Sequence, residues 1–237
     1  MNSELLKTYS FYYQGEYSKI RQAIIDRKQM KPFDVSNAVT IFDEEYPKCF
    51  FDLKYPPFVF YYKGDLSLLK RKCIAVVGSR QPCDYALKAT KALSEHYQDT
   101  VIVSGLAKGI DAFAHQYAKD TIGILGCGID YIYPACNRDL IKDVEKRGLI
   151  ISEYPAYAKP YAYHFPFRNR LIAALSDRVY IMESKARSGT MTTVNEALEL
   201  GKEVRVLPYD IFMAEGVHNN QLIYEGATPV THEEIAF

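Results

Sequence analysis

The chain has 237 residues, a length that suits one large domain or a domain with a smaller appendage. Hydrophobic residues make up 48% and charged residues 24%, as is ordinary for a globular protein in water, and 29 basic residues balance 29 acidic ones. A net charge of zero excludes a protein that is basic throughout, so any surface for nucleic acid must be local.

The five cysteines form no C-x-x-C pair, which favours a reducing cytoplasm over a disulfide framework. No apolar run approaches about 18 residues, and the N-terminus lacks a charged-then-apolar export signal. We therefore expect a soluble cytoplasmic protein with no membrane span.

The first part of the chain has weak patterns. Apolar spacing predicts a helix over Tyr17–Arg27, and a proline-punctuated stretch leads into a predicted strand at Phe58–Tyr62. We interpret residues 1–67 as a lead-in that packs on the main domain, which then covers residues 68–237.

Strand-like and helix-like segments alternate from Cys73 onward. Apolar runs predict strands at 73–77, 101–103, 121–125, 149–152, 178–183 and 203–207. Helices are predicted between them at 84–97, 109–119, 137–147, 168–176 and 189–200, followed by a helix near 219–224 and an edge strand at 229–231. This order predicts an α/β fold with a mainly parallel sheet covered by helices on both faces.

The first of these strands ends at a turn that suits an anion. Ile74–Val77 is apolar throughout, as in a strand buried on both faces, and Gly78, Ser79 and Arg80 follow it directly. Ligands of open α/β sheets bind at the carboxyl ends of the strands. Because an arginine offers a planar fork of donors there, the turn predicts a phosphate or another anion.

Small polar residues follow other strands in the same way. A predicted helix begins near Gly109, and its positive end would face the glycine-rich turn before it, which makes that turn a candidate anion site. Tight βα turns favour glycine and serine in any case, but their recurrence at one sheet edge favours a binding site. The candidates in these turns are Ser104, Gly105, Lys108, Gly109, Ser188, Gly189 and Thr190.

Two arginines flank Asn169 at the expected start of a helix. Arg168 and Arg170 would be unfavourable there because the helix dipole is positive at that end. An ion-paired surface turn is one interpretation. The other is that a nucleic-acid backbone supplies the compensating negative charge.

Cofactor and metal patterns are missing from the sequence. The residues after the first strand are not G-x-G-x-x-G, and no P-loop is present, so we expect neither a dinucleotide nor another cofactor. Asp111 and His115 lie four residues apart without a third ligand, which favours a structural His115, an Asp111 that braces the glycine-rich turn, and no metal. Glu153 and Glu183 are expected to pair with the arginines.

Seven motifs in this order resemble the bacterial DNA-processing protein A (DprA/Smf) family from about Tyr46 to Val230. They are V-G-S-R at 77–80, S-G-L-A-K-G-I-D with A-H at 104–115, G-C-G-I-D-Y-I-Y-P with Asn137 at 126–137, S-E-Y-P at 152–155, F-P-F-R-N-R-L-I-A-A-L-S at 165–176, E-x5-S-G-T at 183–190, and H-N-N-Q-L-I-Y-E-G-A at 218–227.

The resemblance implies an extended Rossmann-like, doubly wound fold that binds single-stranded DNA as a homodimer and loads a RecA-type recombinase in natural transformation. The family's DNA pocket maps onto Arg80, Lys108, Arg168 and Arg170, with Arg138 as a weaker candidate. Dimer and recombinase contacts are expected around residues 218–226. The chain departs from the family at Pro208-Tyr209, where Pro-Gly is usual.

Two other functions remain open. Thr193-x-x-Glu196 matches part of the phosphate-binding turn of nucleotide phosphoribohydrolases, but only one of the three glycines of that turn is present. A sensor of small nucleotides without catalysis is the third interpretation. We expect a protein that is not an enzyme.

Overall fold

The computed structural model describes residues 2–33, 35–186 and 188–235. Its strands are β1 (Ala38–Thr40), β2 (Val59–Gly64), β3 (Cys73–Gly78), β4 (Val101–Ser104), β5 (Thr121–Leu125), β6 (Leu149–Ser152), β7 (Arg178–Glu183), β8 (Glu203–Val206) and β9 (Thr228–Pro229). Its α-helices are α1 (Ser3–Tyr12), α2 (Tyr17–Ile25), α3 (Asp84–His96), α4 (Ile110–Tyr117), α5 (Arg138–Arg147), α6 (His164–Leu175), α7 (Gly189–Glu199) and α8 (Val217–Tyr224).

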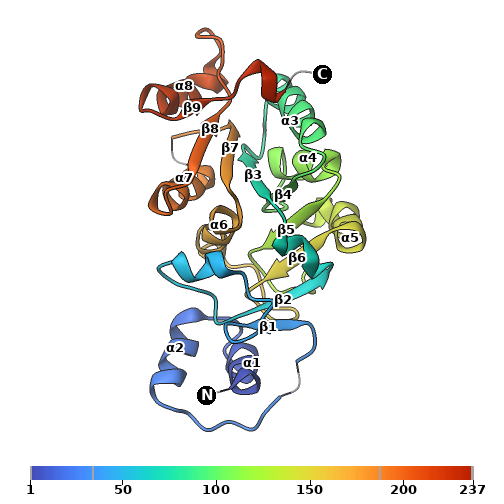
Figure 1. Cartoon of the computed structure of the whole chain (residues 1–237), viewed down its shortest axis with the longest axis vertical. Helices are drawn as coiled ribbons and strands as arrows, with labels where there is room; N and C mark the ends of the chain where they lie inside the picture. The colour runs from blue at the N-terminus through green and yellow to red at the C-terminus, as the bar shows by residue number, and fades with distance from the viewer. Residues whose placement is uncertain (1, 34, 187, 236–237) are drawn as a thin grey trace.

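All the strands of the described ranges join one sheet in the order β1-β2-β6-β5-β4-β3-β7-β8-β9. Neighbours are parallel from β6 to β9, and β1 and β2 join the edge at β6 in antiparallel fashion. Helices α3, α4 and α5 cover one face, and α6 and α7 cover the other (Figure 1). The predicted extended Rossmann-like fold is therefore confirmed. No helix that the structure describes is long and apolar enough to cross a membrane.

The N-terminal residues contribute to the same sheet. β2 pairs with β6, with Tyr61 opposite Ser152. Helices α1 and α2 pack on this edge through a small apolar cluster that includes Leu6 and Tyr9. Neither α1 nor β1 was predicted, because the buried residues of α1 include the polar Thr8 and Ser10 beside Leu6 and Tyr9, and β1 has only three residues. The division at residue 67 stays a prediction.

Helix α6 begins four residues earlier than predicted, at His164. The proline at position 166 lies in the first turn, where a backbone N–H has no partner within the helix and proline is tolerated. Arg168 and Arg170 therefore lie beyond the helix start, and the prediction that both face an unfavourable helix dipole was wrong.

The strand order reverses beside β3. From β3 the chain moves outward through β4, β5 and β6, then returns to place β7 on the other side of β3. β3 is buried along nearly its whole length, as its apolar run predicted. A crevice forms at such a switch point because the connections after β3 and β7 diverge to opposite faces.

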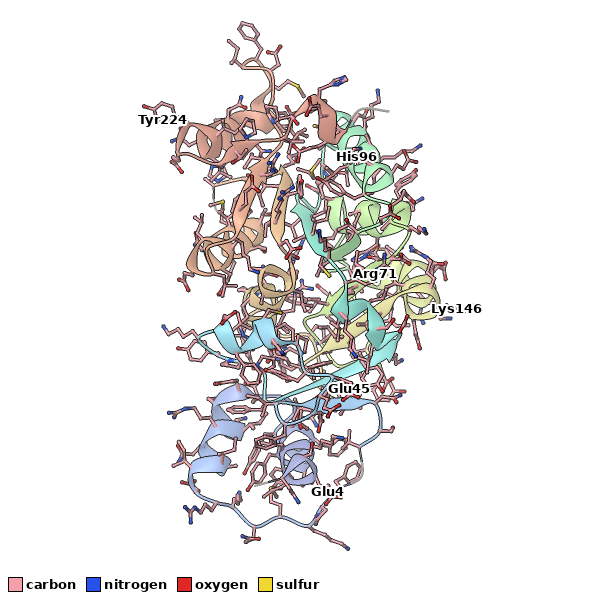
Figure 2. All side chains as sticks on the ribbon, in the orientation of Figure 1. Glu4, Glu45, Arg71, His96, Lys146 and Tyr224 are labelled. Carbon is pink, nitrogen blue, oxygen red and sulfur yellow. The ribbon has the colours of Figure 1, made fainter. Side chains whose placement is uncertain are left out.

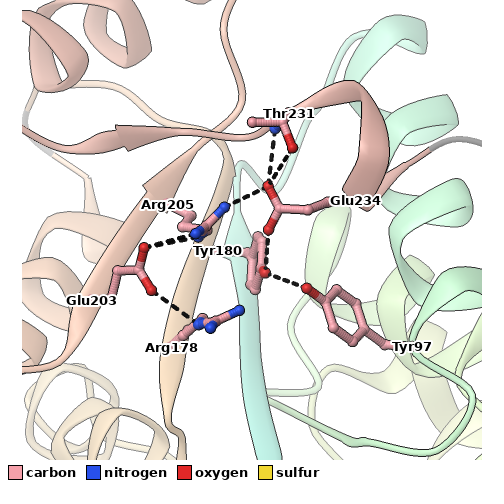
Figure 3. A network of polar contacts seen from close by, with 7 residues as sticks. All are labelled: Tyr97, Arg178, Tyr180, Glu203, Arg205, Thr231 and Glu234. Carbon is pink, nitrogen blue, oxygen red and sulfur yellow. Dashed lines mark hydrogen bonds and ion pairs between the residues drawn. The ribbon is translucent and has the colours of Figure 1, made fainter.

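A polar network fastens the C-terminal residues to the sheet (Figure 3). The Glu234 carboxylate accepts hydrogen bonds from the buried Tyr180 hydroxyl at 2.7 Å and from Arg205 Nη1 at 2.6 Å. Glu203 then lies between Arg205 and Arg178, with ion-pair distances of 2.9 Å to both. The network thus links the last described turn to β7 and β8.

We expect Glu234→Gln to destabilise the fold by about 1.5–3 kcal/mol at pH 7, the usual value of hydrogen bonds to a charged group. Burial alone would raise the pKa of Glu234, but hydrogen bonds from Thr231 and Tyr180 and the charge of Arg205 lower it below 4.5. A depressed carboxyl pKa stabilises the fold above the unfolded-state pKa, and this stabilisation is lost as the pH falls through the folded-state value.

Urea unfolding at pH 7 and at pH 4 or below measures this effect. The difference between wild type and Glu234→Gln should shrink toward the lower pH. The neighbouring Glu233 is exposed, so Glu233→Gln is the matched control. A difference for Glu234→Gln that does not depend on pH would contradict the role of its charge.

Candidate nucleic-acid interface

A cleft of about 910 Å³ opens at the carboxyl ends of the central strands, at the switch point between β3 and β7. A smaller pocket of about 60 Å³ adjoins it and shares several lining residues. Of the residues predicted from sequence, nine line the cleft: Gly78, Ser79, Arg80, Lys108, Arg168, Asn169, Ser188, Gly189 and Thr190. Gly105 lines the smaller pocket.

Arg168 lies at the base of both cavities. Its side chain is almost fully buried, and its Nη1 donates hydrogen bonds to the carbonyl oxygens of Gly105, at 2.8 Å, and Ile124. Its Nε donates to Asn169 Oδ1 at 3.1 Å. Burial lowers the pKa of Arg168 to about 10, so the guanidinium remains charged at neutral pH. It therefore supplies a fixed positive charge at the base of the cleft.

Three more basic side chains line the cleft nearer to solvent. Arg80 follows β3, Lys108 follows β4 and Lys185 follows β7, and all three are exposed. Among the residues that the structure describes, none of these three nor Arg168 takes part in an ion pair. Their charge is available to an anionic ligand.

Asp111 is the acidic residue among the described cleft-lining residues, and it braces the glycine-rich turn as predicted. Its Oδ2 accepts the Gly105 N–H at 3.1 Å. Burial raises the pKa of Asp111, while Arg168 and the N–H groups of Ala107 and Gly105 oppose that shift. The turn therefore binds a carboxylate of the protein itself, so the prediction of an open anion site at these N–H groups was wrong.

Gly105 sits between the buried Arg168 guanidinium and the buried Asp111 carboxyl group. A Cβ atom there would lie 2.5 Å from Arg168 Nη2 and 2.7 Å from Asp111 Oδ2. Any larger residue must displace the guanidinium or the carboxylate, so the close approach of the backbone at Gly105 fixes the base of the pocket.

The start of α7 forms the opposite wall. Ser188, Gly189 and Thr190 are its first residues and its N-cap, and Asn169 Nδ2 donates to the Gly189 carbonyl at 3.0 Å. The positive end of the α7 dipole faces the cleft and adds to the attraction for anions.

Four predicted site residues lie outside both cavities. Ser104 is fully buried and donates to the Val76 carbonyl at 2.6 Å, which joins β4 to β3. Gly109 has a φ of +74°, and a Cβ there would lie 2.3 Å from the Ser79 carbonyl oxygen. Arg138 is exposed on α5, away from the cleft lining. The fourth is Arg170.

Arg170 belongs to a buried ion pair. Its two terminal nitrogens donate to the two carboxylate oxygens of Glu153, both at 2.6 Å, as predicted for Glu153. Its Nε donates to the Tyr55 carbonyl at 3.0 Å, and its guanidinium lies 3.7 Å from the centre of the Phe167 ring. This geometry contradicts the prediction that Arg170 lies in the DNA pocket.

Glu183 does not pair with an arginine, against the prediction. Its Oε2 accepts the Cys83 N–H at 2.8 Å and lies 3.5 Å from the Tyr209 hydroxyl. It thereby holds the turn after β3 against β7. The predicted structural role of His115 agrees with its full burial and its 2.6 Å contact from Nδ1 to Thr121 Oγ1.

Sequence reasoning missed Lys185 and Tyr133 and left Phe165 only as a stacking candidate. All three line the cleft, and Tyr133 and Phe165 have ring centres 5.3 Å apart. The signal for Lys185 was its place just after β7, where the other strand-end cations lie. Tyr133 is in a long loop whose path the sequence does not specify.

The chain is similar to proteins of one family. The family model for DNA recombination-mediator protein A matches residues 37–236. DNA processing protein DprA of Streptococcus pneumoniae is 38% identical over 215 residues, which are 88% of this chain and 76% of the relative. The Bacillus subtilis protein DprA is 36% identical, over 85% of this chain and 70% of its own length.

Two solved structures are similar as well. The X-ray structure of S. pneumoniae DprA has a TM-score of 0.79 at 35% identity and covers 92% of this chain and 79% of that chain. A structure of Helicobacter pylori DNA processing protein A, reported for its single-stranded DNA binding mode, has a TM-score of 0.75 at 36% identity over 81% of this chain and 90% of that one. This chain belongs to the DNA recombination-mediator protein A family.

Proposed function

We propose that this protein binds single-stranded DNA in the cleft and acts as a recombination mediator that passes the strand to a RecA-type recombinase during natural transformation. The observation that carries the proposal is the convergence of Arg80, Lys108 and Arg168 at one cleft. These three residues come from separate segments of the chain. Among the described residues that line the cleft, the carboxyl group is that of Asp111, which already accepts a backbone N–H.

The chemistry fits a phosphate backbone better than a free mononucleotide. A cleft of about 910 Å³ that several cations line has room for more than one phosphate group. Phe165 and Tyr133 add aromatic surface beside those cations, and stacking on such rings binds unpaired bases of any sequence.

Catalysis by a phosphoribohydrolase-like mechanism has less support. Thr193 lines the cleft, but Glu196, which would be the catalytic carboxylate, is not among the described lining residues. We propose a binding protein without catalysis.

Titration of a fluorescently labelled oligothymidylate, followed by anisotropy, tests the function. The salt series should give log K falling with log salt by about 0.7 per phosphate contact. Nucleoside monophosphates should compete poorly with the oligonucleotide and release no free base. Saturable mononucleotide binding that DNA does not displace would instead favour the sensor, and release of base would favour the enzyme.

We also propose that the protein acts as a homodimer and contacts the recombinase near residues 218–226. The preceding loop exposes two large apolar side chains, Ile211 by 82% and Phe212 by 90%. Exposed apolar side chains that lie together favour a protein partner. This loop follows Pro208-Tyr209, where the chain departs from the usual family pattern.

A further inference from the structure

The loop between β6 and α6 carries several exposed tyrosines. Tyr157 is exposed, and Tyr161 and Tyr163 keep 51% and 57% of their surface accessible. Scattered exposed tyrosines are common on proteins. Tyr161 and Tyr163 differ from such scattered residues because their rings are stacked, with centroids 5.8 Å apart and an angle of 12° between the planes.

The orientation of this pair is fixed by its surroundings. The Tyr163 hydroxyl donates to Glu16 Oε1 at 2.5 Å, which ties the loop to the N-cap of α2. Both rings meet His164 edge-on, at 5.3 Å for Tyr161 and 4.6 Å for Tyr163. His164 is buried and stacks on Tyr154 at 3.8 Å. The two exposed rings thus rest on a rigid aromatic base.

In the sequence, the two tyrosines are next to residues that line the cleft. Pro160 and Ala162, the residues on either side of Tyr161, both line the cleft, and so does Phe165. A strand that leaves the cleft at this edge meets the tyrosine pair next.

We propose that Tyr161 and Tyr163 form a stacking platform for the bases of single-stranded DNA outside the cleft. The inference rests on the proposed function and extends the binding site beyond the cations. Unpaired bases present flat π faces that stack on tyrosine without regard to sequence, whereas the bases of a duplex are already stacked on one another.

The local charge favours base contact over phosphate contact at this place. The Glu16 carboxylate lies beside both Tyr163 and His164. A phosphate would be repelled there, while an uncharged base face would not. The nearest cation in the loop is Lys159, which is exposed before Pro160 and can pair with the phosphate of a stacked nucleotide.

A single tryptophan reports on the platform directly, because the chain contains none. In Tyr161→Trp, the indole fluorescence should be quenched when an oligothymidylate of about 16 nucleotides binds, and much less with one of about 4 nucleotides. His96→Trp is the control, since His96 is exposed at the end of α3, outside the cleft lining and away from α1 and α2 (Figure 2). Its fluorescence should not change with either oligonucleotide.

Affinity supplies the second readout. Tyr161→Leu removes the ring but keeps apolar cover over His164, and it should weaken binding of the long oligonucleotide about tenfold, as expected for the loss of one stacked base. The loss should be confined to the long oligonucleotide, and Tyr161→Phe should restore the affinity because the ring returns.

The two possible failures differ. In the first, wild-type protein binds the short oligonucleotide, but the long one does not quench Tyr161→Trp and Tyr161→Leu keeps wild-type affinity. The proposed platform is then wrong, whereas the proposed DNA binding in the cleft is retained. If wild type binds neither oligonucleotide, the proposed function and the platform both fail. Equal quenching by a duplex would overturn the assignment to unpaired bases.

Discussion

Replacing Arg80 and Lys108 together by alanine should weaken binding of single-stranded DNA about 100-fold at low salt. Each side chain is exposed, lines the cleft and takes part in no described ion pair, so its charge is available to a phosphate. A hydrogen bond to a charged group contributes at least about 1.5 kcal/mol, and two such losses correspond to about two factors of ten.

The salt dependence separates lost phosphate contacts from general damage. Loss of two contacts should reduce the slope of log K against log salt by about 1.4, that is, 0.7 for each contact. The effect should be alike for all sequences, because phosphates carry no sequence information. Anisotropy titrations from about 50 to 200 mM salt measure both quantities.

Lys142→Ala is the control for the loss of one exposed positive charge, which is half of the charge change in the double variant. Lys142 is exposed on α5, outside the described cleft lining, and pairs with no described carboxylate. All three substitutions are at exposed positions, so the thermal unfolding temperature should hardly change. Wild-type affinity and slope in the Arg80 and Lys108 double variant would remove the cleft from the proposed interface.

The sheet and the location of the cleft could be predicted from the sequence because both follow from repeated local patterns. Buried strands can be recognised in the sequence as short apolar runs. When the strands are parallel, the residues after each run lie at the same edge of the sheet. Gly78, Ser79 and Arg80 were placed correctly for this reason. The strand order places the cleft at the β3–β7 switch point.

The direction of individual side chains could not be obtained in this way. Arg168 and Arg170 were assigned to one pocket because the resemblance maps the family's DNA pocket onto both, and the helix was expected to start at Arg168. With α6 starting at His164, the two residues lie two positions apart within a helix, and such residues do not share a face. One guanidinium reaches the cleft, and the other lies against Glu153.

The sequence also did not reveal which backbone groups the carboxylates bind. The spacing of Gly105 and Asp111 is compatible with an open turn that binds phosphate and with a turn that a carboxylate already occupies. Asp111 was expected to brace this turn, but only the folded backbone shows that its Oδ2 accepts the Gly105 N–H and so occupies the expected anion site. Glu183 is a similar case. The strand order places it close to Arg80, yet its carboxylate accepts a hydrogen bond from the backbone N–H of Cys83 instead.

The buried pair of Arg170 and Glu153 gives the largest expected effect on stability. Glu153→Gln should destabilise the fold by about 3–5 kcal/mol, because it leaves a buried guanidinium without its counter-charge. For a domain of this size that corresponds to a fall in Tm of about 10 °C. Urea unfolding and thermal melts measure it, with Glu95→Gln, which removes one partner of the exposed Lys91 pair, as a control expected to cost less than about 1 kcal/mol.

A double variant decides whether Arg170 acts on the fold or on DNA. Glu153→Met with Arg170→Met removes both charges together, and replacement of a buried ion pair by apolar side chains of similar volume is often nearly neutral. The double variant should therefore be more stable than Glu153→Gln and should bind oligothymidylate with the wild-type salt slope. A slope that falls by about 0.7 in a variant that remains folded would mean that Arg170 contacts a phosphate after all. It would also mean that DNA binding draws the guanidinium away from Glu153.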